Sequence, residues 1–134
     1  MQVVVFRLGD EQFAVETSKV QNINDIMEIT KVPKSPNYIK GLINLRGTII
    51  SLLDINMLLD ITSSNDTQSN IIILQMQEEL VGITVDEVDE VIDVEEDMIE
   101  KVDTAKKTNC IRGVINLTDR IVTLIDIDKL VQIS

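Results

Sequence analysis

The 134-residue sequence contains no histidine, no tryptophan and a single cysteine, Cys110. Without histidine there is no Ser-His-Asp or Cys-His catalytic arrangement, and one lone thiol cannot form a zinc site of cysteine and histidine ligands. Phosphate-binding glycine loops of the GxxxxGK[ST] and GxGxxG types are also missing. We therefore expect a protein that is not an enzyme and has no metal site and no cofactor. Cys110 is expected to be a buried or incidental thiol.

Aromatic residues are scarce, with two Phe and one Tyr, whereas Ile and Val together number 36. Branched aliphatic side chains favour β-strands, so the composition predicts an all-β domain with an aliphatic core. No apolar run approaches the roughly 20 residues of a membrane span, and the first residues lack the basic start of a signal peptide. These observations predict a cytoplasmic protein that does not insert into a membrane.

The formal net charge of −11 is concentrated in the second half of the chain. Residues 1–70 carry 8 acidic and 6 basic side chains, a net of −2, whereas residues 71–134 carry 15 and 6, a net of −9. The densest stretch, Asp86–Glu100, has nine carboxylates and no basic residue. It is either a solvated face or a docking face for a basic partner or cation. Because it lacks a turn-forming glycine, a calcium loop is not expected, and nucleic acid is disfavoured by the negative charge.

The chain contains an internal duplication. Residues Ile39–Leu59 align with Ile111–Val131 at an offset of 72, with ten of 21 positions identical. A weaker similarity at an offset of 68 relates the segment from Phe6 to Ile23 to that from Leu74 to Val91. Two copies are too few for a solenoid. The pattern therefore predicts two similar subdomains of about 65 residues packed face to face.

Turn signals between short apolar runs predict two β-hairpins in each half. The expected strand pairs are Gln2–Leu8 with Gln12–Glu16, Leu42–Arg46 with Thr48–Leu53, Ile71–Met76 with Leu80–Val85, and Val114–Leu117 with Ile121–Ile125. Several strands are apolar on consecutive positions, which indicates that both of their faces are covered, as in a small closed barrel that packs on its twin. Helices are expected to be few and short. One is predicted after Thr17 or Ser18, with Val20 and Ile23 on one face.

Two aspartates occupy equivalent positions in the duplication, Asp54 and Asp126. A symmetric carboxylate pair is one interpretation, because two such groups can share a proton. However, neither is followed by the Thr/Ser-Gly sequence of a dyad protease. A short helix is expected after each aspartate, so both residues are better interpreted as helix N-caps.

Differences between the two copies indicate where function is located. Gly41 and Asn44 recur as Gly113 and Asn116, so their expected roles are structural: close backbone approach for glycine, and hydrogen bonds at a turn or between the halves for asparagine. Arg46 and Gly47 do not recur, because Thr118 and Asp119 replace them. Arg46 is therefore a candidate partner contact, with a solvated surface charge as the alternative.

Three segments together carry a family resemblance. They are FRLGDEQFAVETSKVQNI (Phe6–Ile23), VPKSPNYIKGLINLRGTIISLLD (Val32–Asp54) and VGITVDEVDEVI (Val81–Ile92). In combination they resemble CheW, the coupling protein of bacterial chemotaxis, over essentially the whole chain. The resemblance implies a single CheW-like domain of two five-stranded SH3-like β-barrels around a shared hydrophobic interior. The expected boundaries are approximately 1–66 and 67–134, with strands free to cross between them.

The same resemblance implies a non-enzymatic adaptor. CheW-like proteins bridge the cytoplasmic tip of transmembrane chemoreceptors and the histidine kinase CheA, whose regulatory domain has the same fold, so the protein would be recruited to receptor arrays at the membrane. Two alternatives stay open at this point: a CheW-type adaptor of another kinase array, for pili or gene regulation, and a purine-binding module.

Functional positions carried over from the family fall into two sets. A receptor-binding groove would be lined by Val20, Ile23, Val85, Val88 and Val91, with Arg46 beside it. Arg46 and Gly47 match positions important for coupling, and Gly41 and Gly82 match structural glycines. The chain departs from the family at Asn22, where Glu is common, so a charge contact from that position is not expected here.

Overall fold

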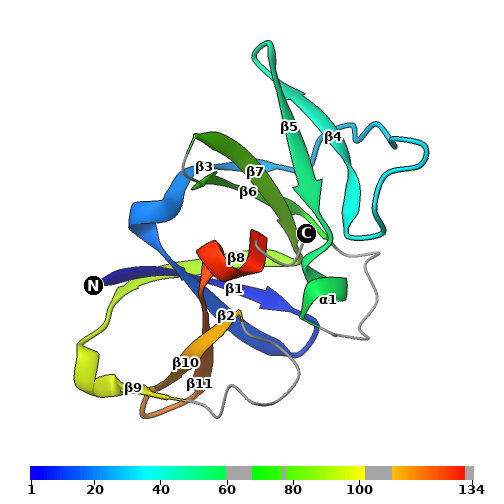
Figure 1. Ribbon diagram of the computed structural model, residues 1–134. Coiled ribbons are helices and arrows are strands. Elements are labelled where there is room, and N and C mark those ends of the chain that lie inside the picture. Colours follow the sequence, from blue (N-terminus) through cyan, green and yellow to red (C-terminus); the bar gives the residue numbers. More distant parts are fainter. Residues whose placement is uncertain (60–67, 77, 102–109, 132–134) are drawn as a thin grey trace.

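The computed structural model describes residues 1–59, 68–76, 78–101 and 110–131, and it confirms an all-β protein with a few short helices. Figure 1 shows two curled sheets packed on one another. Sheet A contains six strands in the order β8 (Glu87–Asp93), β1 (Gln2–Leu8), β2 (Glu11–Glu16), β11 (Ile121–Ile125), β10 (Ile111–Asn116) and β9 (Ile99–Glu100). Sheet B contains five, in the order β3 (Val20–Asp25), β6 (Asn70–Met76), β7 (Glu79–Val85), β5 (Thr48–Leu53) and β4 (Ile39–Leu45).

Among the described residues, three short helical segments lie between strands: η1 (Thr17–Lys19), α1 (Ile55–Leu58) and η2 (Glu96–Met98). A fourth, α2 (Ile127–Val131), follows the last strand. All four predicted hairpins are present as antiparallel pairs, so the turn signals located them correctly. Sheet A exceeds the expected five strands because the two-residue strand β9 pairs with β10.

The two sheets do not correspond to the two halves of the sequence. Hairpin β1–β2 lies in sheet A beside β8, β10 and β11, whereas hairpin β6–β7 lies in sheet B beside β3, β4 and β5. A boundary near residue 66 therefore does not separate the subdomains. Each half contributes a hairpin to the sheet formed mainly by the other half, and the exchange is reciprocal (Figure 1).

Two parallel strand pairs carry this exchange, in the same register. Strand β5 pairs with β7 through Ser51 with Val81 and Leu52 with Gly82. Strand β11 pairs with β2 through the equivalent positions, Thr123 with Phe13 and Leu124 with Ala14. The packing leaves no room for a side chain at Gly82, since a Cβ atom there would lie 2.6 Å from the Leu52 Cδ2 atom. Ala14, its counterpart, is also small and fully buried.

The apolar side chains form three clusters, and their separation follows from the alternation of side chains along each strand. One cluster fills the interior of sheet A and includes Val3, Val5 and Leu124. A second fills the interior of sheet B and includes Ile71 and Ile73. The largest lies between the sheets and receives side chains from both, among them Val4, Phe6, Leu8, Ile72, Leu74 and Ile83. We call this largest cluster the shared core, and it confirms the expected aliphatic interior common to both subdomains.

One helix prediction was wrong. The segment from Val20 to Ile23 was expected to be helical because its apolar residues are three apart, but it belongs to strand β3. A β-bulge between Val20 and Asn22 explains the error, since it puts residues three apart on one face of a strand. Thr17 begins the short η1 turn before the strand.

Gly41 and Gly113 are retained in both copies because another segment crosses them closely. A Cβ atom at Gly41 would lie 2.7 Å from the Thr30 carbonyl oxygen, and one at Gly113 would lie 2.7 Å from that of Glu100. Both glycines also follow a register shift in their hairpins. This geometry agrees with the role in close backbone approach predicted for them.

We expect Gly41→Ala and Gly113→Ala each to lower the free energy of unfolding by about 1–3 kcal/mol, because a backbone atom cannot move aside as a flexible side chain can. Urea denaturation followed by circular dichroism measures the change. Thr48→Ala, at an exposed position of β5, is the control and should change stability by less than about 0.5 kcal/mol. Unchanged stability in both glycine variants would contradict the assigned packing.

Candidate functional site

The outermost strands β3 and β8 carry four of the five groove positions predicted from the family resemblance, and the duplication makes them equivalent. Val20 and Ile23 on β3 correspond to Val88 and Val91 on β8 at the offset of 68. Each strand has a bulge between its two apolar residues. As a result both residues of each pair lie on the face that looks towards the shared core.

On both strands, the first apolar residue is more buried than the second. Val20 and Val88 are partly buried against the shared core, whereas Ile23 is 42% exposed and Val91 is 53% exposed. The fifth expected groove residue, Val85, is fully buried in the shared core, so a partner cannot contact its side chain directly in this structure. We call the face formed by Val20, Ile23, Val88 and Val91 the edge-strand face.

Strands β3 and β8 run in opposite directions, and each begins near the end of the other. The Asn70 side chain accepts a hydrogen bond from the Val88 backbone N–H at 3.3 Å, while Asn70 pairs with Asp25 at the end of β3. At the other end, Thr17 Oγ1 donates to the Gln2 carbonyl at 3.3 Å, and Gln2 pairs with Asp93 at the end of β8. The edge-strand face is thus built from both halves of the chain.

Arg46 and Gly47 form the tip of hairpin β4–β5. Both have positive φ angles, 53° and 89°, as a two-residue hairpin turn of this kind requires. The Asn44 Oδ1 atom accepts a hydrogen bond from the Gly47 N–H at 2.8 Å, which confirms the turn role predicted for this asparagine. Arg46 is exposed and has no ion pair within the described residues. Arg46 was expected beside the groove, but its strand β4 and the groove strand β3 are at opposite ends of the strand order of sheet B. The strand pairing of the described residues therefore does not bring Arg46 to the edge-strand face.

Asp54 and Asp126 are helix caps, as predicted. Asp54 accepts a hydrogen bond from the Met57 N–H at 3.2 Å, and Asp126 accepts one from the Lys129 N–H at 3.4 Å. Their backbones are also held alike, since the Asp54 N–H donates to the Tyr38 carbonyl and the Asp126 N–H to the Cys110 carbonyl, both at 2.7 Å. Each carboxylate therefore serves the first turn of its own helix, α1 or α2.

Two equivalent polar junctions join the exchanged hairpins to their neighbours, the first with one charged side chain and the second with several. In the first, the Gln68 amide accepts from the Lys40 ammonium and donates to Asn56 Oδ1 and to the Thr84 carbonyl, at 3.2 and 3.1 Å. Asn56 and Thr84 are buried. This junction is a largely neutral hydrogen-bond network.

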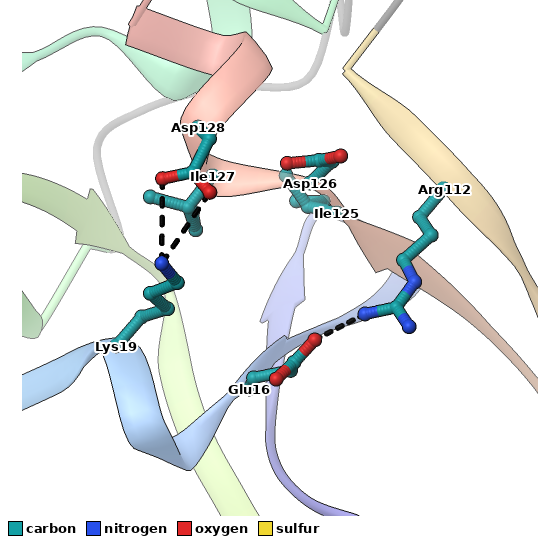
Figure 2. Close-up of a pocket in the computed structure, with 7 residues that line it drawn as sticks. All are labelled: Glu16, Lys19, Arg112, Ile125, Asp126, Ile127 and Asp128. Atoms are coloured by element: carbon teal, nitrogen blue, oxygen red, sulfur yellow. Dashed lines mark hydrogen bonds and ion pairs between the residues drawn. The ribbon is translucent and has the colours of Figure 1, made fainter. Parts of the chain in front are cut away.

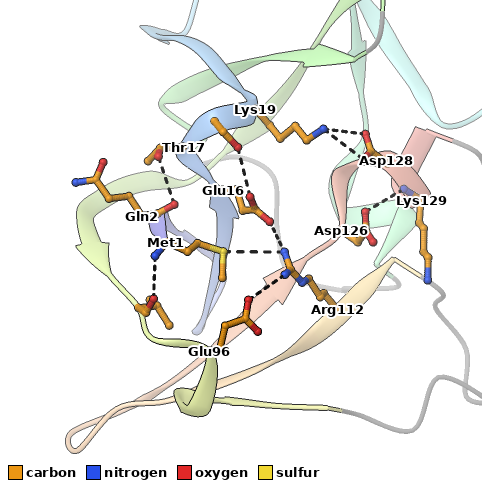
Figure 3. A network of polar contacts seen from close by, with 12 residues as sticks. Met1, Gln2, Glu16, Thr17, Lys19, Glu96, Arg112, Asp126, Asp128 and Lys129 are labelled. Carbon is orange, nitrogen blue, oxygen red and sulfur yellow. Dashed lines mark hydrogen bonds and ion pairs between the residues drawn. The ribbon is translucent and has the colours of Figure 1, made fainter.

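In the second junction, Arg112, Asp128 and Glu16 occupy the positions that Lys40, Asn56 and Thr84 occupy in the first. Figure 2 shows Arg112 paired with Glu16, and Lys19 paired with Asp128 at 3.3 Å, around a cavity of about 140 Å³. Figure 3 shows the same contacts continuing to Glu96, which lies 3.9 Å from Arg112. The cations and anions of this junction are paired with one another and join η1, β2, β10 and α2.

The acidic stretch of the second half is partly neutralised within the protein. Arg7 pairs with Glu87 and lies 3.4 Å from Asp89, and Arg120 lies 3.1 Å from Glu90. Among the described residues, no group of three or more carboxylates, thiols or imidazoles is arranged to hold a metal ion. None of the helices in the described part of the chain is long and apolar enough to cross a membrane.

Sequence reasoning missed two exposed isoleucines. Ile49 on β5 and Ile121 on β11 occupy equivalent positions beside the hairpin turns and are 60% and 63% exposed. The signal was present in the duplication, because both copies retain an isoleucine at a position that the alternation of the strand directs away from the barrel interior. Large apolar side chains exposed at equivalent places mark two further candidate contact surfaces, one on each sheet.

Exposed apolar strand faces on a two-sheet β scaffold define a binding module. Comparison with known proteins gives its family. The model of the CheW-like domain matches residues 2–134, and the chain belongs to the CheW family, whose members are scaffold proteins of chemotaxis and not enzymes.

Several relatives support this assignment. The chain is 29% identical to a probable chemotaxis protein CheW of Rhizobium etli, over 96% of this chain and 86% of the relative. It is 30% identical to the chemotaxis protein CheW of Klebsiella aerogenes, over 98% and 81%. The crystal structure of the scaffolding protein TtCheW from Thermoanaerobacter tengcongensis superposes with a TM-score of 0.88 at 31% identity, covering 96% of this chain and 86% of that chain.

Cys110 is buried in the shared core, as expected, and burial raises the pKa of its thiol. We expect its alkylation in the folded protein to be at least ~100-fold slower than in denaturant. Because the pKa of Cys110 is raised in the folded protein, folding favours the neutral thiol. This contribution to stability is fully present below the pKa of the unfolded thiol and is lost as the pH rises through the pKa of the folded thiol. Thiol labelling followed over pH measures both effects. Equal labelling rates in the folded and unfolded protein would contradict this burial.

Proposed function

We propose that this protein is an adaptor that couples the cytoplasmic tip of transmembrane chemoreceptors to the histidine kinase CheA. The observation that carries the proposal is the presence of two kinds of exposed apolar surface on one two-sheet body: the edge-strand face, and the two equivalent hairpin surfaces at Ile49 and Ile121. An adaptor needs such a pair, because it must bind two partners at the same time.

The edge-strand face is the proposed receptor surface. Ile23 and Val91 are exposed at the centre of the face, and Val20 and Val88 connect it to the shared core. A face of this kind suits the apolar side of a helix. Because its residues come from both sheets, a helix bound there would contact both subdomains. Arg46 is proposed as an additional receptor contact from the β4–β5 tip.

The hairpin surfaces around Ile49 and Ile121 are the proposed kinase contacts. They lie one on each sheet and are equivalent under the duplication. The regulatory domain of CheA has the same fold as CheW, so a kinase domain can pair with a barrel of this protein through matching strand ends. The protein would be recruited from the cytoplasm to receptor arrays by these contacts, and receptor movement could then bias the kinase.

Isothermal titration of the protein with the regulatory domain of its cognate CheA, and separately with a receptor-tip fragment, tests the proposal. Ile49→Asp and Ile121→Asp should weaken only kinase binding, whereas Ile23→Asp and Val91→Asp should weaken only receptor binding. Arg46→Ala should weaken receptor binding, and because Arg46 lies on the same hairpin turn as Ile49, both titrations are made with this variant. A loss of at least ~10-fold is expected where a central apolar contact is replaced by a charge.

Met57→Asp is the matched control for these variants, since Met57 is an exposed apolar residue on α1 outside both surfaces. It should leave both affinities unchanged. If the folded wild-type protein binds neither the kinase domain nor the receptor fragment, the adaptor function is wrong. If all five variants bind both partners normally, the two surfaces are misassigned.

A further inference from the structure

The edge-strand face carries, besides its apolar residues, two carboxylates at equivalent positions. Asp25 ends strand β3 and Asp93 ends strand β8, and the offset of 68 relates them. Each lies two residues beyond the exposed apolar side chain of its strand, so it shares that residue's face. Their cross-strand neighbours, Asn70 and Gln2, continue the core-facing rows of β6 and β1.

These two carboxylates differ from the other acidic residues of β8. Glu87, Asp89 and Glu90 on β8 each lie within 4 Å of an arginine, Arg7 or Arg120. Asp25 and Asp93 are exposed and have neither a hydrogen bond nor an ion pair to another described side chain. Within β8, the negative charge is thus paired with arginine at Glu87, Asp89 and Glu90 and unpaired at Asp93, on the face that is proposed to bind a partner.

The two charges lie at opposite ends of the face. Asp25 is close to the start of β8, because Asn70 joins it to Val88. Asp93 is close to the start of β3, because Gln2 joins it to Thr17. The apolar residues Ile23 and Val91 lie between the two carboxylates along the strands. A partner seated on the apolar residues would therefore meet one carboxylate near each end.

We infer that the edge-strand face binds an amphipathic helix that carries lysine or arginine on both flanks of its apolar stripe. This inference rests on the proposed receptor-binding role of the same face and specifies the chemistry of the helix. Two basic flanks would match the two carboxylates, while the stripe covers Ile23 and Val91. The net charge of −11 would attract such a helix at long range and would repel one with acidic flanks.

Two designed helical peptides provide the test. They share one apolar stripe and differ only in their flanks, which are lysine in one and glutamate in the other. The protein should bind the lysine peptide at least ~10-fold more tightly at low salt, and the difference should shrink at about 0.5 M salt because exposed charges are then screened. Fluorescence anisotropy of labelled peptides measures both affinities.

Asp25→Asn and Asp93→Asn should each weaken binding of the lysine peptide about fivefold, and the double variant should weaken it further. Asp25→Lys combined with Asp93→Lys should reverse the preference in favour of the glutamate peptide. Asp10→Asn and Glu79→Gln, at exposed positions outside the face, are the matched controls and should bind as the wild type does.

Three outcomes would overturn the inference. Equal binding of the two peptides would do so while leaving the adaptor function intact, provided that the receptor-tip fragment still binds. Unchanged peptide binding by the asparagine variants, together with new self-association, would show that the carboxylates protect sheet edges instead. If neither peptide nor the receptor-tip fragment binds the folded protein, the inference and the proposed receptor surface are both wrong.

Discussion

The parallel pairing of β5 with β7, and of β2 with β11, is the interaction on which the rest of the structure depends. Parallel neighbours cannot be joined by a tight turn, so each pair brings together strands from different halves of the chain. The two pairs have equivalent registers and neighbouring small residues, Gly82 and Ala14, that permit close packing. Neither sheet can be completed by one half alone, so we expect the protein to unfold as one cooperative unit despite its duplication.

This exchange also creates the surface proposed to bind partners. Placing β1–β2 and β6–β7 at the centre of the two sheets leaves β3 and β8 as outer strands, each paired on one side only. Their bulges direct two apolar residues per strand towards the shared core, and the outer residue of each pair extends beyond that core into solvent. The edge-strand face is thus a continuation of the core that both halves build. A helix bound to it would report on the relative position of the two sheets.

Local sequence patterns were sufficient to predict the four hairpins, the two helix caps and the protein family. Gly9, Gly47 and the polar turns located four hairpins, and Asp54 and Asp126 located two helix starts. The strand β3 was missed because a bulge imitates the spacing of a helix, as at Val20 and Ile23. Pairing between the halves could not be predicted, since no local pattern specifies which distant strand will lie beside β7. Burial of Val85 depends on that same packing, and the unpaired state of Asp25 and Asp93 became visible only with the positions of Arg7 and Arg120.

Fragment complementation tests the reciprocal exchange most directly. Residues 1–66 and 67–134 would be produced separately and examined by circular dichroism and by NMR, alone and mixed. The exchange predicts that each fragment alone lacks a stable fold, because its sheet is missing a central hairpin, and that an equimolar mixture regains the spectrum of the intact protein. A fragment that folds cooperatively on its own, with dispersed amide resonances and an unfolding transition unaffected by the other fragment, would contradict the exchanged architecture.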